Sequence, residues 1–264
     1  MVGLTQLETR FFGYTQSTRT ATVATGDLAA AVGIAPEQEK RVLSRLSRRG
    51  LIARVRRGLY LVPPRIPPGG RWSPSEALAL ATLMADQKAR YQISGPNAFS
   101  RYGWDEQVSN SVFVYNNRMS GERSIGAVEL TLVKVADKRL GATDIAETPE
   151  GIPLFYASRA RALMDAVYDW SRFNTVPRAF DWIRDELRRD DRIAADLVSV
   201  TLKYGNQGTL RRIGKVLEVA GASRPLLRKI ERSLRPTTSF IPWIPTQRKR
   251  GTTDKRWMLL LNDA

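Results

Sequence analysis

The residues with the clearest chemical pattern are the arginines and lysines near the N-terminus. Ten basic side chains and no acidic one lie between Glu39 and Glu76. Cations gathered without counter-charges bind polyanions, and the arginine fork in particular pairs with guanine edges and phosphates. Over the whole chain, Lys and Arg number 42 against 26 acids, which gives a formal charge of +16. This excess predicts a nucleic-acid partner.

The excess charge is confined to the two ends of the chain. The net charge is +8 over residues 1–72, −1 over residues 73–210 and +9 over residues 211–264. Two basic regions therefore flank a balanced one, and each is a candidate for binding a polyanion.

Enzymatic chemistry has few residues available to it. The sequence contains neither Cys nor His, which excludes disulfides, Cys or His zinc sites, thiol nucleophiles and the commonest general base. Two carboxylate pairs at helical spacing, Asp165 with Asp169 and Asp181 with Asp185, are candidates for a divalent cation. Neighbouring arginines favour salt-bridged helix surfaces over a metal-dependent nuclease. We therefore expect no enzyme activity, no metal and no cofactor.

The segment GNQGTLRRIGK is similar to a phosphate-binding loop but departs from it. Five residues instead of four separate Gly208 from Gly214, and Val216 stands where Ser or Thr is required. A helix opened by Asn206 fits better, with Leu210 and the apolar residues after it buried. Basic side chains of this helix and of the last predicted turn form a candidate second surface for nucleic acid or a partner: Arg211, Arg212, Lys215, Arg248, Lys249 and Arg250. A solvated basic face or a protected strand edge is the alternative.

A helix-turn-helix would position the N-terminal arginines. Apolar spacing predicts a first helix around residues 4–11, and TGDLAAAVG predicts a second, capped by Thr25 or Asp27 and ended by Gly33. A third helix follows over residues 36–49 after a tight turn, with a proline at its start.

The predicted third helix is amphipathic. Val42, Leu43 and Leu46 fall on one face at about 100° per residue. The polar side chains of the other face and its flanks are the candidate DNA contacts of this helix: Gln38, Lys40, Arg41, Ser44, Arg45 and Arg48.

After Gly50 the pattern changes to period two. LIARV and LYLV bracket Arg56-Arg57-Gly58 and predict a hairpin, with Leu51, Ala53 and Val55 on one side. Its candidate DNA contacts are Arg54, Arg56 and Arg57. Helices followed by a basic hairpin are typical of a winged helix-turn-helix, which we expect over residues 1–62.

The remainder of the chain predicts a larger domain. PPRIPPGG predicts a stiff spacer over residues 63–70, within a linker over residues 63–72, and Ser73-Pro74-Ser75-Glu76 predicts a capping box at the start of a domain over residues 73–264. Strands are expected in NSVFVYN, AVELTLVKV, IPLFYAS, FIPWIP and RWMLLLN, and helices dominate from Arg159. The predicted fold class is α+β: a winged helix-turn-helix followed by a larger mixed α/β domain.

Several longer phrases resemble a known family. These are YQISGPNAFSRYGWDEQVSNSVFVYN, VELTLVKV, GIPLFYASRARALMDAV, KYGNQGTLRRIGKVLE and KRWMLLLN, together with RRGLYLV of the predicted wing. They resemble the AbiEi-like antitoxins of AbiE abortive-infection systems over nearly the whole chain. The resemblance implies an antitoxin that represses its own promoter through residues 36–49 and 51–62, and whose C-terminal domain restrains a nucleotidyltransferase-like toxin.

The patterns predict a protein that binds double-stranded DNA, and the resemblance implies an autoregulating antitoxin that acts at its own promoter and has a cognate nucleotidyltransferase-like toxin as a partner. The alternative is an antitoxin that neutralises its toxin by protein contact alone, without specific DNA binding. The sequence shows neither a signal peptide nor an apolar run of membrane-spanning length, so a cytoplasmic location is expected.

Overall fold

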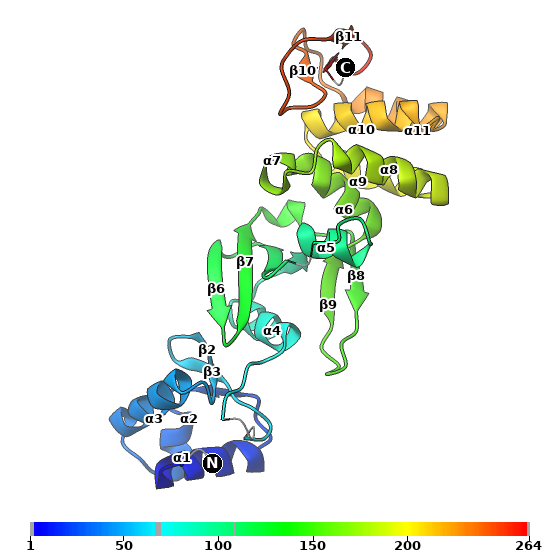
Figure 1. Cartoon of the computed structure of the whole chain (residues 1–264). Coiled ribbons are helices and arrows are strands. Elements are labelled where there is room, and N and C mark those ends of the chain that lie inside the picture. The colour runs from blue at the N-terminus through cyan, green and yellow to red at the C-terminus, as the bar shows by residue number, and fades with distance from the viewer. Residues whose placement is uncertain (1–2, 67–69, 108, 263–264) are drawn as a thin grey trace. The chain divides into compact units, whose positions relative to one another are not determined.

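A computed structural model describes residues 3–66, 70–107 and 109–262. The chain forms two compact units. Unit 1 comprises residues 1–91, 110–134 and 147–154, and unit 2 comprises residues 92–109, 135–146 and 155–264. Figure 1 shows their elements.

Unit 1 begins with three helices and a small antiparallel sheet. The helices are α1 (Gln6–Ser17), α2 (Asp27–Val32) and α3 (Pro36–Arg48). The strands are β1 (Thr22–Ala24), β2 (Ala53–Arg56) and β3 (Leu59–Leu61), in the order β1-β3-β2. Phe11, Leu28, Leu43, Leu46 and Leu61 are fully buried beneath them. The three helices and the β2–β3 hairpin confirm the predicted winged helix-turn-helix.

The start of α2 is capped by a residue of α3. Glu39 is fully buried, and its carboxylate accepts hydrogen bonds from the backbone N–H groups of Gly26, Leu28 and Ala29 at 2.7, 2.9 and 3.3 Å. The predicted caps were wrong, because Gly26 occupies the cap position and Asp27 accepts from the N–H of Ala24 before the helix. A buried anion at a helix N-terminus satisfies donors that otherwise lack partners. Glu39 therefore fixes α2 against α3.

The remainder of unit 1 contains helix α4 (Glu76–Asp86) and three strands, β5 (Val112–Asn116), β6 (Gly121–Ile125) and β7 (Val128–Lys134). Their order is β6-β7-β5, with β6–β7 antiparallel and β5–β7 parallel. The predicted capping box begins two residues too early, because Ser75 is the cap and its Oγ accepts from the N–H of Leu78. Ser73 instead accepts from the N–H of Ala127 at 2.8 Å.

The segment after β3 joins these two parts of unit 1. The N–H of Trp72 donates to the carbonyl of Gly50 at 2.7 Å, which ties the segment to the end of α3. Residues 67–69 of the predicted spacer lie outside the described residues. The predicted spacer falls inside unit 1, so an independent domain over residues 1–62 stays a prediction.

Unit 2 contains strands in the order β4-β9-β8 and a helical layer. The strands are β4 (Tyr91–Ile93), β8 (Thr143–Ala146) and β9 (Leu154–Ala157), of which β4 and β9 each begin with a residue of unit 1. The helices are α5 (Pro96–Arg101), η1 (Asp137–Arg139), α6 (Arg159–Tyr168), α7 (Trp170–Phe173), α8 (Arg178–Arg189), α9 (Ile193–Tyr204), α10 (Gln207–Val219) and α11 (Arg224–Ser233). The predicted strands in both units and the helical region from Arg159 are confirmed, and the class is mixed α and β.

A second small sheet ends the chain. It consists of β10 (Ile241–Pro242), β11 (Thr252–Asp254) and β12 (Leu259–Leu261), in the order β10-β12-β11. Trp257, just before β12, packs so closely on α10 that a Cβ built on Gly214 would lie 2.2 Å from its ring. Gly214 is therefore a packing residue, which agrees with rejecting a phosphate loop here.

Candidate nucleic-acid interface

Helix α3 presents its predicted polar face to solvent. Val42, Leu43 and Leu46 are buried in the core, as predicted. The polar candidates of this helix are all exposed: Gln38, Lys40, Arg41, Ser44, Arg45 and Arg48. The helix therefore separates an apolar face, which holds the fold, from a face able to enter a DNA groove.

The cations of this face differ in how far they are already paired. Lys40 forms an ion pair with Glu37 at 2.8 Å, and the Nε of Arg45 lies 3.1 Å from an oxygen of Glu8 on α1. Within the described part of the chain, the side chains of Arg41 and Arg48 make no hydrogen bond or ion pair. Arg41 and Arg48 are therefore the two arginines of α3 most available to an external anion.

Glu8 shows why Arg45 is less available. Its side chain is buried, and it also accepts from Arg49 and from the N–H of Thr5. Burial raises the pKa of this carboxyl, but the Thr5 hydrogen bond and the charges of Arg49 and Arg45 outweigh it and hold the pKa below its usual value. The cluster holds α1 to the C-terminal half of α3.

The wing carries arginines in two different states. Arg54 and Arg57 are exposed, and neither side chain makes a hydrogen bond or ion pair with another described residue. Arg56 instead makes a two-pronged contact with Asp86 at the end of α4, at 2.7 and 2.6 Å. This hydrogen bonding lowers the pKa of Asp86. Arg56 therefore already belongs to an ion pair inside unit 1. Local sequence patterns could not identify Asp86 as its partner.

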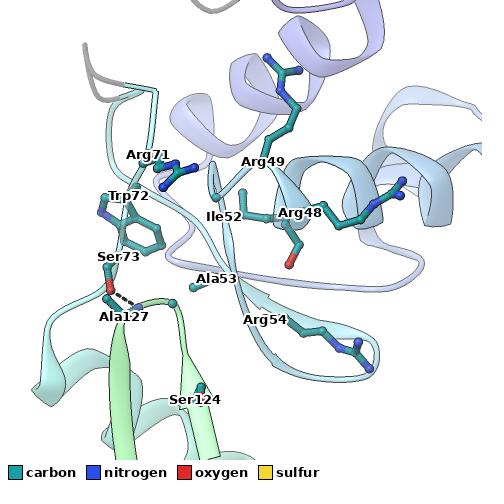
Figure 2. A pocket seen from close by; sticks show the side chains of 13 residues that line it. Arg48, Arg49, Ile52, Ala53, Arg54, Arg71, Trp72, Ser73, Ser124 and Ala127 are labelled. Carbon is teal, nitrogen blue, oxygen red and sulfur yellow. Dashed lines mark hydrogen bonds between the residues drawn. The ribbon is translucent and has the colours of Figure 1, made fainter. Parts of the chain in front are cut away.

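A cleft of about 720 Å³ lies beside the C-terminal end of α3 (Figure 2). Its walls come from α3, β2, the segment after the spacer and the β6–β7 turn. Among the described residues lining it, Arg48, Arg49, Arg54 and Arg71 are cationic and none is acidic. The sequence-based candidates include Arg48 and Arg54 but omit Arg71.

The predicted second basic surface is wrong for helix α10. Arg211 and Arg212 were expected to face outward, but each is only 7% exposed because the C-terminal strands cover the helix. Arg212 donates to the carbonyls of Pro242 and Trp243, and burial, with the nearby charge of Arg211, lowers its pKa to about 10. Lys215, also expected to face outward, is held between Glu218 and Asp254 at 3.2 and 2.9 Å.

Exposed cations of unit 2 lie elsewhere. Arg248, Lys249 and Arg250 are exposed in the turn before β11, as the sequence suggested. Sequence reasoning missed α11, where the exposed basic residues recur at spacings of three and four, a signal that was present in the sequence. They are Arg224, Arg228, Arg232 and, just after the helix, Arg235.

Three of the four carboxylates in the predicted pairs, Asp165, Asp181 and Asp185, form ion pairs with arginines. Asp165 is fully buried and bonded to Arg161 and Arg139. Asp181 and Asp185 pair with arginines one turn along α8. Within the described residues, no three acidic side chains are grouped so that they could hold a metal ion.

No helix in the described part of the chain is both long and apolar enough to cross a membrane.

The fold and exposed basic face of the N-terminal part define a winged helix-turn-helix protein. Residues 21–63, which hold α2, α3 and the three strands, match the family described as transcriptional regulator, AbiEi antitoxin. The match agrees with the predicted family resemblance over these residues, and it extends to no other part of the chain.

The chain was also compared with curated proteins and with solved structures. No curated protein matches the chain. Among solved structures, the crystal structure of the RV2827C protein from Mycobacterium tuberculosis is similar, with a TM-score of 0.59 and 16% sequence identity, covering 98% of this chain and 92% of that one. At this identity the similarity concerns the fold.

Proposed function

We propose that the chain is a sequence-specific DNA-binding repressor of its own promoter, in which α3 enters the major groove and the β2–β3 wing contacts the adjacent backbone. The observation that carries the proposal is a set of exposed arginines on these two elements whose side chains make no hydrogen bond or ion pair with another described residue: Arg41, Arg48, Arg54 and Arg57. The matched family of regulators supports the same function.

We infer different roles for these arginines from their positions. Arg41 lies in the N-terminal half of α3, the part of a recognition helix that reaches base edges, where its fork suits guanine O6 and N7. Arg54 and Arg57 lie on the wing, and their contacts are with phosphates, which set register without reading sequence.

Footprinting of the purified full chain on its own upstream DNA tests the proposal, combined with binding of Arg41→Ala. Arg172→Ala is a matched control, because Arg172 is exposed in α7 of unit 2 and its side chain has no bond to another described residue. Arg41→Ala is expected to weaken binding to the protected site by about 1–3 kcal/mol, and more than to random DNA. A chain that prefers no upstream fragment over random competitor would refute the proposal.

The family also includes the antitoxin role, and we infer that unit 2 restrains a nucleotidyltransferase-like toxin. The observation that favours a partner surface is the exposed arginine row of α11, whose members make no ion pair within the described residues. Arg228→Glu with Arg232→Glu is expected to weaken rescue of growth when the full chain is co-expressed with a nucleotidyltransferase-like protein encoded beside it. Rescue equal to that of the wild type would refute this surface, and the Arg172→Glu control should leave rescue unchanged.

A further inference from the structure

We propose that the cleft beside the C-terminal end of α3 is a binding groove for the phosphodiester backbone, and that Arg71 is a DNA contact that lies outside the winged helix itself. The inference rests on the proposed DNA-binding function and extends it to the segment that follows the spacer. It adds a residue that neither α3 nor the wing contains.

The first argument is the charge of the cleft. The side chains of Arg48, Arg54 and Arg71 are exposed and make no bond with another described residue, and no described lining residue is acidic. These three arginines come from α3, β2 and the segment after the spacer. Because no described lining residue carries a negative charge, an external polyanion meets no competing carboxylate among the residues that line the cleft.

The second argument is that Arg71 is held in place. The adjacent residue, Trp72, donates its N–H to the carbonyl of Gly50, and Ser73 accepts from the N–H of Ala127. A Cβ built on Gly126 would lie 2.8 Å from the Ser73 hydroxyl and 2.9 Å from Pro74, so the segment packs closely on the β6–β7 turn. Two attachments on either side of the cleft fix the backbone that carries Arg71, which limits the entropy lost when its side chain binds an anion.

The third argument concerns the kind of anion. In Figure 2 the labelled guanidinium groups of Arg48, Arg54 and Arg71 lie apart and do not converge on one point. A single compact anion would reach only part of this set, whereas the phosphates of a nucleic-acid strand present successive charges along a line. The open cleft therefore fits a strand that passes the end of the recognition helix, where contacts to phosphates orient a DNA-binding protein.

The test measures duplex binding by the full chain against salt concentration for the wild type, Arg71→Ala, Arg71→Lys and Arg65→Ala. Arg65 is the matched control, because it is exposed in the predicted spacer but does not line the cleft. Loss of one phosphate contact is expected to reduce the slope of log K against log salt by about 0.9. Arg71→Ala should show this reduction with operator and random duplexes alike, whereas Arg71→Lys and Arg65→Ala should keep the wild-type slope.

The possible outcomes separate this inference from the proposed function. A wild type that prefers its operator, with Arg71→Ala and Arg65→Ala indistinguishable, overturns the role of Arg71 and leaves the repressor intact. A wild type without sequence preference whose slope still depends on Arg71 supports the groove and refutes specific repression. A chain that binds no duplex overturns both, and so does Arg71-dependent binding of a free nucleotide without any binding of DNA.

Discussion

Replacing Glu39 by Gln should destabilise the winged helix far more than its position in a charged helix suggests. The buried carboxylate accepts from three backbone N–H groups at the start of α2. Gln keeps one carbonyl oxygen but places an NH₂ group opposite a donor and removes the charge that favours a helix N-terminus. Losing one charge-assisted hydrogen bond and leaving its donor buried costs about 2–3 kcal/mol, which corresponds to a Tm lower by roughly 4–12 °C for a chain of this size.

Thermal unfolding followed by circular dichroism measures this loss, and Glu37→Gln is the control. Glu37 lies two residues earlier on α3 but is exposed, and its ion pair is with Lys40 at the surface. Removing such a surface pair should leave Tm nearly unchanged. If Glu39→Gln and Glu37→Gln melt together, Glu39 does not hold α2 to α3 and the reasoning is refuted.

Two further predictions concern buried charges. Because the pKa of Glu8 is lowered in the folded protein, its bonds to Arg45 and Arg49 stabilise the fold fully above the unfolded pKa of about 4.3, and this contribution is lost as the pH falls through the lower folded value. Glu8→Gln should therefore have a lower Tm than the wild type at pH 7, and this difference in Tm should disappear below about pH 4. Melting curves recorded over a series of pH values measure the difference, and a difference that does not change with pH would contradict this linkage. Arg212→Ala should cost about 2–4 kcal/mol in urea unfolding, because two carbonyls lose their donor, yet leave the salt dependence of DNA binding unchanged. A flatter salt dependence with unchanged stability would instead place Arg212 at the surface.

The elements of the winged helix could be predicted because each depends on local patterns. The spacing of Val42, Leu43 and Leu46 identifies the buried face of α3, and alternation around Gly58 identifies the hairpin. The two faces of α3 and the buried side of the hairpin are as predicted, because the side chains of a helix or a strand have a fixed geometric period. Ile52 alternates with the buried residues and was predicted on the side of Arg54 and Arg56, but it is also buried in the core. The strand at residues 128–134 also alternates, whereas all five residues of the strand at 112–116 are buried, so its prediction depended on a short run rich in β-branched and aromatic residues.

The partners of charged residues could not be predicted, because they depend on residues distant in the sequence. Asp86 lies thirty residues after Arg56, and nothing in the wing signals that it will be paired. Arg212 was assigned to an outer face from helical period alone, but β10 supplies a cover thirty residues further along. A helix whose basic face is covered by another part of the chain has the same spacing of apolar and basic residues as a helix whose basic face is exposed. Helical spacing alone therefore cannot distinguish the two cases.

The number of basic residues in a segment therefore differs from the number that are free to bind an external anion. Within the acid-free tract, Arg45, Arg49 and Arg56 already pair with carboxylates inside unit 1. An external anion that displaced these partners would leave a buried Glu8 or a largely buried Asp86 without a counter-charge, which is costly. The affinity for a polyanion should therefore come from the arginines without such partners. This moves the expected DNA contact from Arg56 at the tip of the wing toward the C-terminal end of α3 and the cleft beside it.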